Sequence, residues 1–64
     1  MQIGERLRNA RKQRGVTQKR LQELSGVLQR RISSIENSQI IADVETLRKM
    51  AIGLRIPLHK LICE

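Results

Sequence analysis

Aromatic side chains are absent from this chain of 64 residues, which contains no Phe, Tyr or Trp. Single-stranded nucleic acid is usually held by bases that stack on aromatic rings, so this composition disfavours single-strand binding. The single cysteine, Cys63, excludes an internal disulfide, and with a single histidine, His59, one chain cannot assemble a Cys/His zinc site. The fold is therefore expected to rest on packing alone, without a metal or other cofactor.

Long apolar runs are also missing. No segment approaches the length of a membrane span, and the N-terminus lacks the hydrophobic region of a signal peptide. We therefore expect a cytoplasmic protein. Enzyme signatures are missing as well, since the chain has no phosphate loop, no paired carboxylates at one site and no nucleophile beside a base. We expect neither catalysis nor a small-molecule ligand.

Acidic residues are scarce, with six Asp and Glu against thirteen Lys and Arg, for a formal net charge of +7. Clustered cations are costly to hold together unless a partner neutralises them, so the chain should bind a polyanion. Nucleic acid is the first candidate and an anionic membrane the second. The excess is greatest from Met1 to Arg20, where seven basic residues accompany one acid, Glu5.

Apolar residues at helical spacing predict an all-α fold of five short helices without strands. Sixty-four residues suffice for one domain only, which we take as residues 1–64. The predicted helices are Ile3–Gln13, Gln18–Ser25, Gln29–Asn37, Val44–Leu54 and a last helix that starts at Pro57.

Residues at the ends of these segments support the assignment. Thr17 and Asp43 are good N-caps, because their side-chain oxygens can accept a hydrogen bond from a free first-turn amide. Gly26 stands where a left-handed residue can close the second helix sharply before the third begins. The short connection predicts that the second and third helices form a helix-turn-helix.

In a helix-turn-helix, the first helix of the motif crosses the phosphate backbone and the second lies in the major groove. The motif needs buried residues from both helices, and the candidates are Leu21, Leu24, Val27, Ile32 and Ile35. Four residues of the third helix then remain free to face DNA bases: Gln29, Arg30, Ser33 and Ser34. Gln bonds adenine and Arg bonds guanine bidentately, so Gln29 and Arg30 are the strongest candidates.

Nearly the whole chain resembles the phage repressor and Cro-like helix-turn-helix domains, also called the xenobiotic-response-element type. Four stretches carry the resemblance: IGERLRNARKQRGVTQ, L-x-x-L-S-G-V in the turn, ISSIEN, and VETLRKMAIGLRIPLHKL. The resemblance implies a compact five-helix fold and a sequence-specific transcriptional regulator of double-stranded DNA, a repressor being expected.

The resemblance also assigns roles to individual residues. It implies that Gln18 and Asn37 contact backbone phosphate and that Arg11 pairs with Glu36 to tie the first helix to the third. An exposed pair of this kind would contribute about 0–1 kcal/mol. Free amides beside the Thr17 cap can also receive a phosphate oxygen. Lys19 and Arg31 are further candidate phosphate contacts.

Four features depart from the family pattern. Leu28 occupies the cap position of the third helix, where relatives often carry Ser or Thr, and its side chain can contact a thymine methyl group instead. Ser38 to Ile40 replaces the usual glycine and basic residue of the following loop. Arg55 replaces the glycine that ends the fourth helix, so a positive φ is expected there. Gln22 replaces a small alanine and should alter how the second and third helices pack.

Repressor-type domains usually bind as twofold dimers, so we expect a homodimer on DNA. Exposed apolar residues around Ile40, Leu58 and Ile62 are the candidate contact, although either Ile40 or Ile41 should anchor its loop on the core. The alternative function is a protein-interaction module, such as an antitoxin or adaptor domain, that docks a partner through the Ile40–Ile41 loop and the last helix.

Overall fold

Helices account for most of the structure, which is a computed structural model and describes residues 3–62. The elements, in chain order, are α1 Ile3–Gln13, α2 Gln18–Ser25, α3 Gln29–Glu36, α4 Val44–Leu54 and α5 His59–Ile62. The all-α prediction is confirmed, and so are the predicted bounds of the first, second and fourth helices. Within the described residues, no helix is both long enough and apolar enough to span a membrane.

Two predicted bounds were wrong by one or two residues. The third helix ends at Glu36 instead of Asn37, because Ser38 takes a left-handed φ of 60° and turns the chain away. The last helix begins at His59 instead of Pro57. Pro57 still opens the preceding turn, in which its carbonyl accepts a hydrogen bond from the Lys60 N–H at 3.1 Å.

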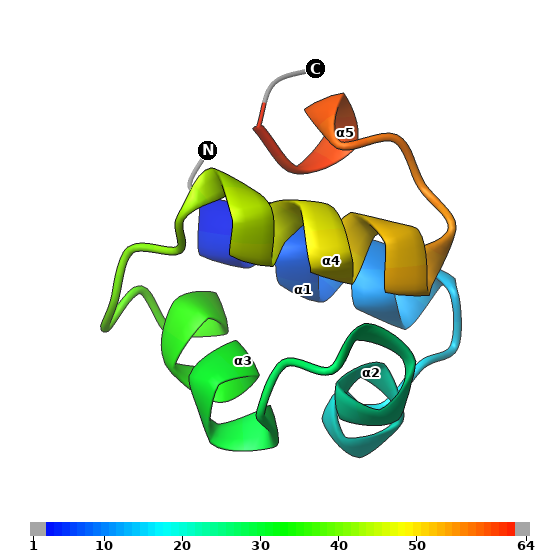
Figure 1. Cartoon of the computed structure of the whole chain (residues 1–64), viewed down its shortest axis with the longest axis horizontal. Coiled ribbons are helices and arrows are strands. Elements are labelled where there is room, and N and C mark those ends of the chain that lie inside the picture. The colour runs from blue at the N-terminus through cyan, green and yellow to red at the C-terminus, as the bar shows by residue number, and fades with distance from the viewer. Residues whose placement is uncertain (1–2, 63–64) are drawn as a thin grey trace.

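The elements are arranged so that α2 and α3 form one end of the molecule and α5 lies at the other (Figure 1). Helix α2 packs against α3 and α4, and α1 packs against α3 and α5. The buried core between them contains residues from every helix and from the turn of the motif: Leu7, Leu21, Val27, Ile32, Ile35, Leu47, Met50, Ala51, Leu54 and Leu61.

Leu24 was expected in this core, and that expectation was wrong. Its side chain is 43% exposed. The reason lies on α4, where Gly53 faces α2 so closely that a Cβ on Gly53 would lie 3.3 Å from the Leu24 Cβ. The Leu24 side chain lines an open hollow on the surface together with Gly53 and Leu54 of α4. Leu21, one turn earlier, is completely buried and anchors α2 instead.

The predicted caps are confirmed. Thr17 Oγ1 accepts from the Arg20 N–H at 3.0 Å, and Asp43 Oδ1 accepts from the Thr46 N–H at the same distance. Gly26 closes α2 with a φ of 78°. Arg55 closes α4 in the left-handed conformation, with a φ of 59°. Such a φ is uncommon for a residue with a side chain, so the backbone is locally strained there.

Arg14 stabilises the strained end of α4. Its Nε donates to the Leu54 carbonyl at 2.9 Å, and its Nη2 donates to the Arg55 carbonyl at 2.6 Å. The last carbonyls of a helix have no partner within the helix, and they carry partial negative charge. The Arg14 guanidinium therefore donates hydrogen bonds to these carbonyls and also places a positive charge beside their partial negative charge.

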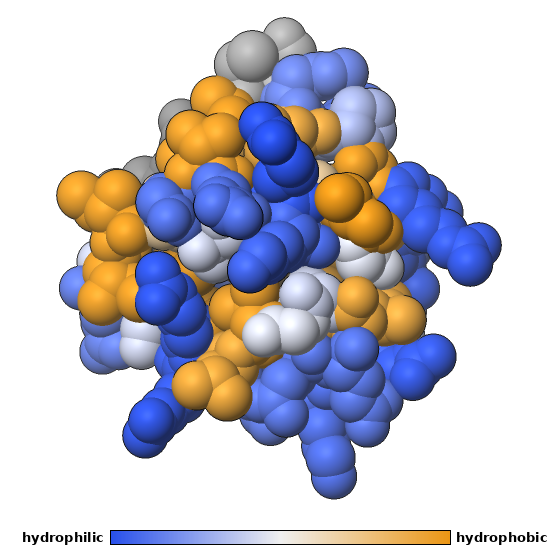
Figure 2. Space-filling view, in the orientation of Figure 1, coloured by the Kyte–Doolittle hydropathy of each residue, from blue (hydrophilic) through white to orange (hydrophobic). Residues whose placement is uncertain are grey.

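The expectation that Ile40 or Ile41 anchors the α3–α4 loop was also wrong. Ile41 is 94% exposed, and Ile40 is 41% exposed and does not pack against the core, whereas the small Ala42 does. Apolar atoms gather at the edge of the molecule where this loop lies (Figure 2). Leu58 was expected to be exposed, but it is half-buried against the core, because the α5 region folds back on α1.

Glycine is needed at Gly4, where α1 crosses the end of α3. A Cβ there would collide with the Ile35 carbonyl oxygen and lie 2.8 Å from that of Glu36. Gly4 is buried, and its missing side chain brings α1 against the last turn of α3. This close approach places the arginines of α1 beside the helix that carries the candidate DNA-reading residues.

Candidate nucleic-acid interface

A groove of about 480 Å³ runs between α2 and α3 at the end of the molecule opposite α5. Its lining is polar apart from one side chain and consists of Gln18, Gln22, Leu28, Gln29, Arg30 and Ser33. Three of the four predicted base-reading residues therefore share one surface. The fourth, Ser34, is half-buried and does not line the groove.

The beginning of α3 forms one wall of the groove and is capped from α2. Leu28 stands at the N-cap position and makes no side-chain cap bond. Instead, Gln22 Oε1 accepts the Gln29 N–H at 2.5 Å. The sequence indicated only that Gln22 would affect packing. Its role as an acceptor was missed because the donor lies on the next helix, seven residues away.

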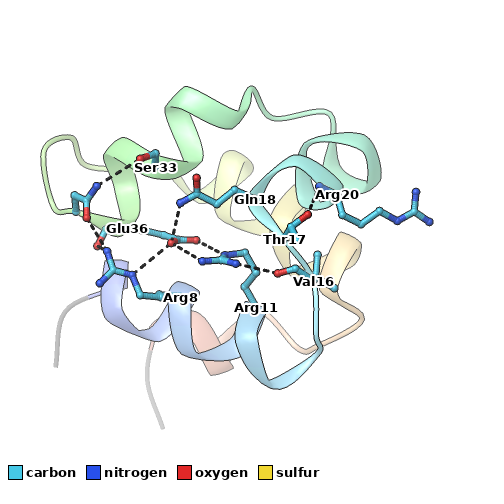
Figure 3. A network of polar contacts seen from close by, with 9 residues as sticks. Arg8, Arg11, Val16, Thr17, Gln18, Arg20, Ser33 and Glu36 are labelled. Carbon is cyan, nitrogen blue, oxygen red and sulfur yellow. Dashed lines mark hydrogen bonds and ion pairs between the residues drawn. The ribbon is translucent and has the colours of Figure 1, made fainter.

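The end of α3 is held by a buried carboxylate, as Figure 3 shows. The Glu36 side chain is completely buried, and its Oε2 lies 2.7 Å from Arg11 Nε. Its Oε1 accepts from Arg11 Nη2 at 3.1 Å and from Gln18 Nε2 at 3.2 Å. The predicted pair of Arg11 and Glu36 is present, but it is not the exposed pair of small energy considered above.

Arg8 belongs to the same network and was not predicted. Its Nε lies 3.5 Å from Glu36 Oε1, and its Nη2 donates to the Glu36 carbonyl at 3.3 Å and to Asn37 Oδ1 at 2.6 Å. The available signal was its spacing, because Arg8 precedes Arg11 by three residues and therefore lies on the same side of α1. The network joins α1, α2 and α3.

The charge state of Glu36 follows from these contacts. Burial alone would raise the pKa of its carboxyl group, because burial disfavours the charged form. Hydrogen bonds from Arg11, Gln18 and Arg8, together with the positive charge of Arg11, outweigh burial and lower the pKa below its ordinary value of 4.5. Glu36 is therefore a carboxylate at neutral pH.

Two predicted phosphate contacts, Gln18 and Asn37, are oriented by this network. Gln18 donates one amide hydrogen to Glu36, and the second hydrogen of the same nitrogen remains for another acceptor. Asn37 receives the Arg8 bond on its oxygen, while its nitrogen donates to Ser33 Oγ at 3.4 Å. The network thus fixes side chains at the edge of the groove.

The other predicted phosphate contacts, Thr17, Lys19 and Arg31, are exposed. Thr17 caps α2, so its hydroxyl oxygen already accepts a hydrogen bond. Lys19 lies in the first turn of α2 and Arg31 in the first turn of α3. Hydrophilic side chains cover most of the end formed by α2 and α3 (Figure 2). This end presents cations beside the groove.

Comparisons with known proteins agree with this geometry. A family model described as "Helix-turn-helix" matches residues 7–61. Among solved structures, the chain is similar to the restriction-modification controller protein C.AhdI from Aeromonas hydrophila, with 30% sequence identity and a TM-score of 0.89. That match covers 92% of this chain and 89% of the other. A search of curated proteins found no match.

Proposed function

The chain belongs to the Cro/C1-type helix-turn-helix family of DNA-binding transcriptional regulators, and we propose that it is a repressor that reads double-stranded DNA with α3. The observation that carries this proposal is the groove between α2 and α3, which gathers Gln29, Arg30 and Ser33 on one open surface. A protein bound over a promoter would block access of the transcription machinery.

Gln29 and Arg30 are the proposed base-reading residues. Both are exposed, and both lie in the first turn of α3, the part of a recognition helix that meets base edges. Each bidentate contact with a base contributes roughly 1–3 kcal/mol of discrimination. Ser33, one turn later on the same wall, is a supporting reader. Ser34 is a weaker candidate because it lies outside the groove.

Phosphate contacts are proposed at the edges of this surface. Lys19 and Arg31 contribute charge, while Gln18 and Asn37 contribute amide hydrogens whose positions are set by Glu36 and Arg8. Thr17 contributes through the free amides beside its cap. Such contacts orient a protein on the duplex without reading its sequence.

Selection of bound sequences from a random duplex pool tests the proposal. We expect a short motif repeated as a palindrome, with centres about one helical turn apart. Equal recovery of all sequences would contradict specific reading.

Replacing Lys19 or Arg31 with Ala should lower the slope of log affinity against log salt by about 1 for each lost phosphate contact. An unchanged slope in both variants would remove these two contacts from the proposal.

A homodimer on DNA is proposed through the α3–α4 loop and the last helix. Ile40, Ile41, Val44 and Ile62 are exposed apolar side chains, and a shallow groove beside Ile41 is lined by Ile3, Gly4, Ile35, Ser38, Ile40 and Ala42. Replacing Ile41 with Lys should weaken cooperative binding to a palindrome and leave binding to a half-site unchanged. A partner protein captured by the same surface without DNA would favour the alternative function, an antitoxin or adaptor domain.

Repression is tested by a reporter gene whose promoter carries the selected palindrome. Expression of the protein should lower reporter output, and a promoter with a scrambled site should not respond. A rise in output on the selected site would show activation and contradict the repressor assignment while leaving DNA reading intact.

A further inference from the structure

Position 28 is unusual because the N-cap of α3 carries an apolar side chain. Leu28 has φ −58° and ψ 140°, and its carbonyl accepts from the Arg31 and Ile32 N–H groups, both at 3.0 Å. The Leu28 backbone therefore has the conformation and the hydrogen bonds of an N-cap residue. Its side chain has no oxygen, whereas Ser, Thr, Asp or Asn would accept a first-turn amide at this position. The missing acceptor has to come from elsewhere.

Gln22 supplies an acceptor from α2, but for the N–H of the first helical residue instead of the second or third, which a capping side chain at position 28 would reach. Its Oε1 lies 2.5 Å from the N–H of Gln29, the first residue of α3, which is one of the donors that a helix leaves without an internal partner. The side chain is half-buried and forms part of the groove wall. The hydrogen bond spans the turn at Gly26 and ties α2 to the start of α3.

The side chain at position 28 is thereby released from capping. Leu28 is 55% exposed and is the one apolar member of the groove lining, beside Gln29 and Arg30. Exposure of an apolar side chain to water is unfavourable, and contact with an apolar group on the partner removes this cost. On the base edges of the major groove, the apolar group is the 5-methyl of thymine.

We propose that Gln22 is a positioning residue that caps α3, so that Leu28 can read the 5-methyl group of thymine. This inference rests on the proposed function, because it needs α3 to lie in the major groove. It adds a specificity-determining residue, Leu28, and explains why α2 carries a long polar side chain at position 22.

Replacing single thymines by uracil tests the role of Leu28, because uracil keeps the base pair and loses only the methyl group. The probe is the selected duplex, with one thymine changed at a time. For the wild-type protein we expect a loss of about three- to fourfold in affinity at one position of each half-site. Leu28→Ala should bind the thymine and uracil duplexes equally well.

This experiment distinguishes failure of the Leu28 assignment from failure of the proposed function. If every uracil duplex binds the wild-type protein as well as its thymine counterpart, while scrambled duplexes still bind weakly, the Leu28 assignment is overturned and DNA reading stands. If selected and scrambled duplexes bind equally well, the proposed function itself fails.

The role of Gln22 is tested by variants that remove or keep the hydrogen-bond acceptor at position 22. Gln22→Met removes the acceptor at similar length, so it should lower the melting temperature and reduce the thymine-to-uracil affinity ratio. Gln22→Glu keeps an acceptor and should preserve that ratio, even if its charge weakens binding to all duplexes equally. Unchanged melting temperature and ratio in Gln22→Met would overturn the proposal.

The double variant Gln22→Met with Leu28→Ser returns the cap to position 28. We expect its melting temperature to recover toward the wild-type value, while the thymine-to-uracil ratio falls to one. Retention of the wild-type ratio by the double variant would show that Leu28 does not read the methyl group.

Discussion

At its first residue, α3 donates its backbone N–H to the Gln22 side chain, whereas at its last residue a buried carboxylate accepts hydrogen bonds from Arg8, Arg11 and Gln18. The side chains also differ. Those at the start are exposed and line the groove, and Glu36 at the end is completely buried. The two ends of this short helix therefore have different roles. Contacts at the end fix the position of the helix in the fold, and the side chains at the start remain free to contact a partner.

The largest effect on folding is expected from Glu36→Ala. Removing one member of a buried ion pair leaves the other charge without a partner, and Arg11 is only 12% exposed. We expect a loss of about 3 kcal/mol in the free energy of unfolding, measured by urea denaturation. The matched control is Glu23→Ala, which removes an exposed ion pair with Arg20 and should cost less than about 1 kcal/mol. Equal losses in the two variants would contradict a structural role for the end of α3.

Gly4→Ala should have the next largest effect. A methyl group there meets backbone atoms of Ile35 and Glu36, which cannot move aside as a flexible side chain would. We expect a loss of about 2 kcal/mol in the free energy of unfolding. Asn9→Ala, on the exposed side of the same helix, should be neutral or slightly stabilising, because Ala is the better helix former. Unchanged stability of Gly4→Ala would mean that α1 and α3 are not in close contact.

Acid should weaken the same end of α3 by a smaller amount. The pKa of Glu36 is lowered in the folded protein, so its contribution to stability is present above the ordinary value of 4.5 and is lost as pH falls through the lower folded value. The urea midpoint of the wild-type protein should therefore fall from pH 6 to pH 3. Glu36→Gln should fall less over this range.

Asp43 is the control for this pH dependence. The hydrogen bond from Thr46 lowers the pKa of Asp43, so this cap also weakens in acid. Asp43→Asn should retain the part of the pH dependence that belongs to Glu36. If Glu36→Gln and the wild-type protein show the same pH dependence, the network does not stabilise the charged carboxylate.

Variants at the start of α3 should change stability least. Arg30 is exposed and has no ion pair among residues 3–62. Arg30→Ala should therefore alter the free energy of unfolding by less than about 0.5 kcal/mol. A loss as large as that of Glu36→Ala would remove the distinction between the two ends of α3.

Local features of the fold could be predicted from the sequence. Thr17, Asp43 and Gly26 were identified correctly because a cap or a left-handed turn depends on that residue and its near neighbours. Leu24 was misjudged because its exposure depends on how α2 meets α4, whose residues are distant in the sequence and adjacent in space. Helical periodicity indicates which face of a helix is buried, but not which residues of a neighbouring helix that face will meet.

The residues of the candidate site also fall into those that the sequence pattern predicted and those that it missed. Gln29 and Arg30 were identified from the helix-turn-helix pattern, and the structure brings them together in one groove. Arg8 and Gln22 were missed, because their partners lie 28 and 7 residues away and on other helices. Such contacts are set by the packing of three helices, which the spacing of residues along one helix does not specify.

The most direct test of the central claim compares Arg30→Ala with Arg48→Ala, an exposed arginine on α4 outside the groove. Affinity is measured on the selected duplex and on a scrambled duplex of the same composition. We expect Arg30→Ala to lose roughly tenfold in affinity for the selected duplex and little for the scrambled one, with Arg48→Ala close to wild type on both. Equal losses for the two variants on both duplexes would contradict sequence reading by the start of α3.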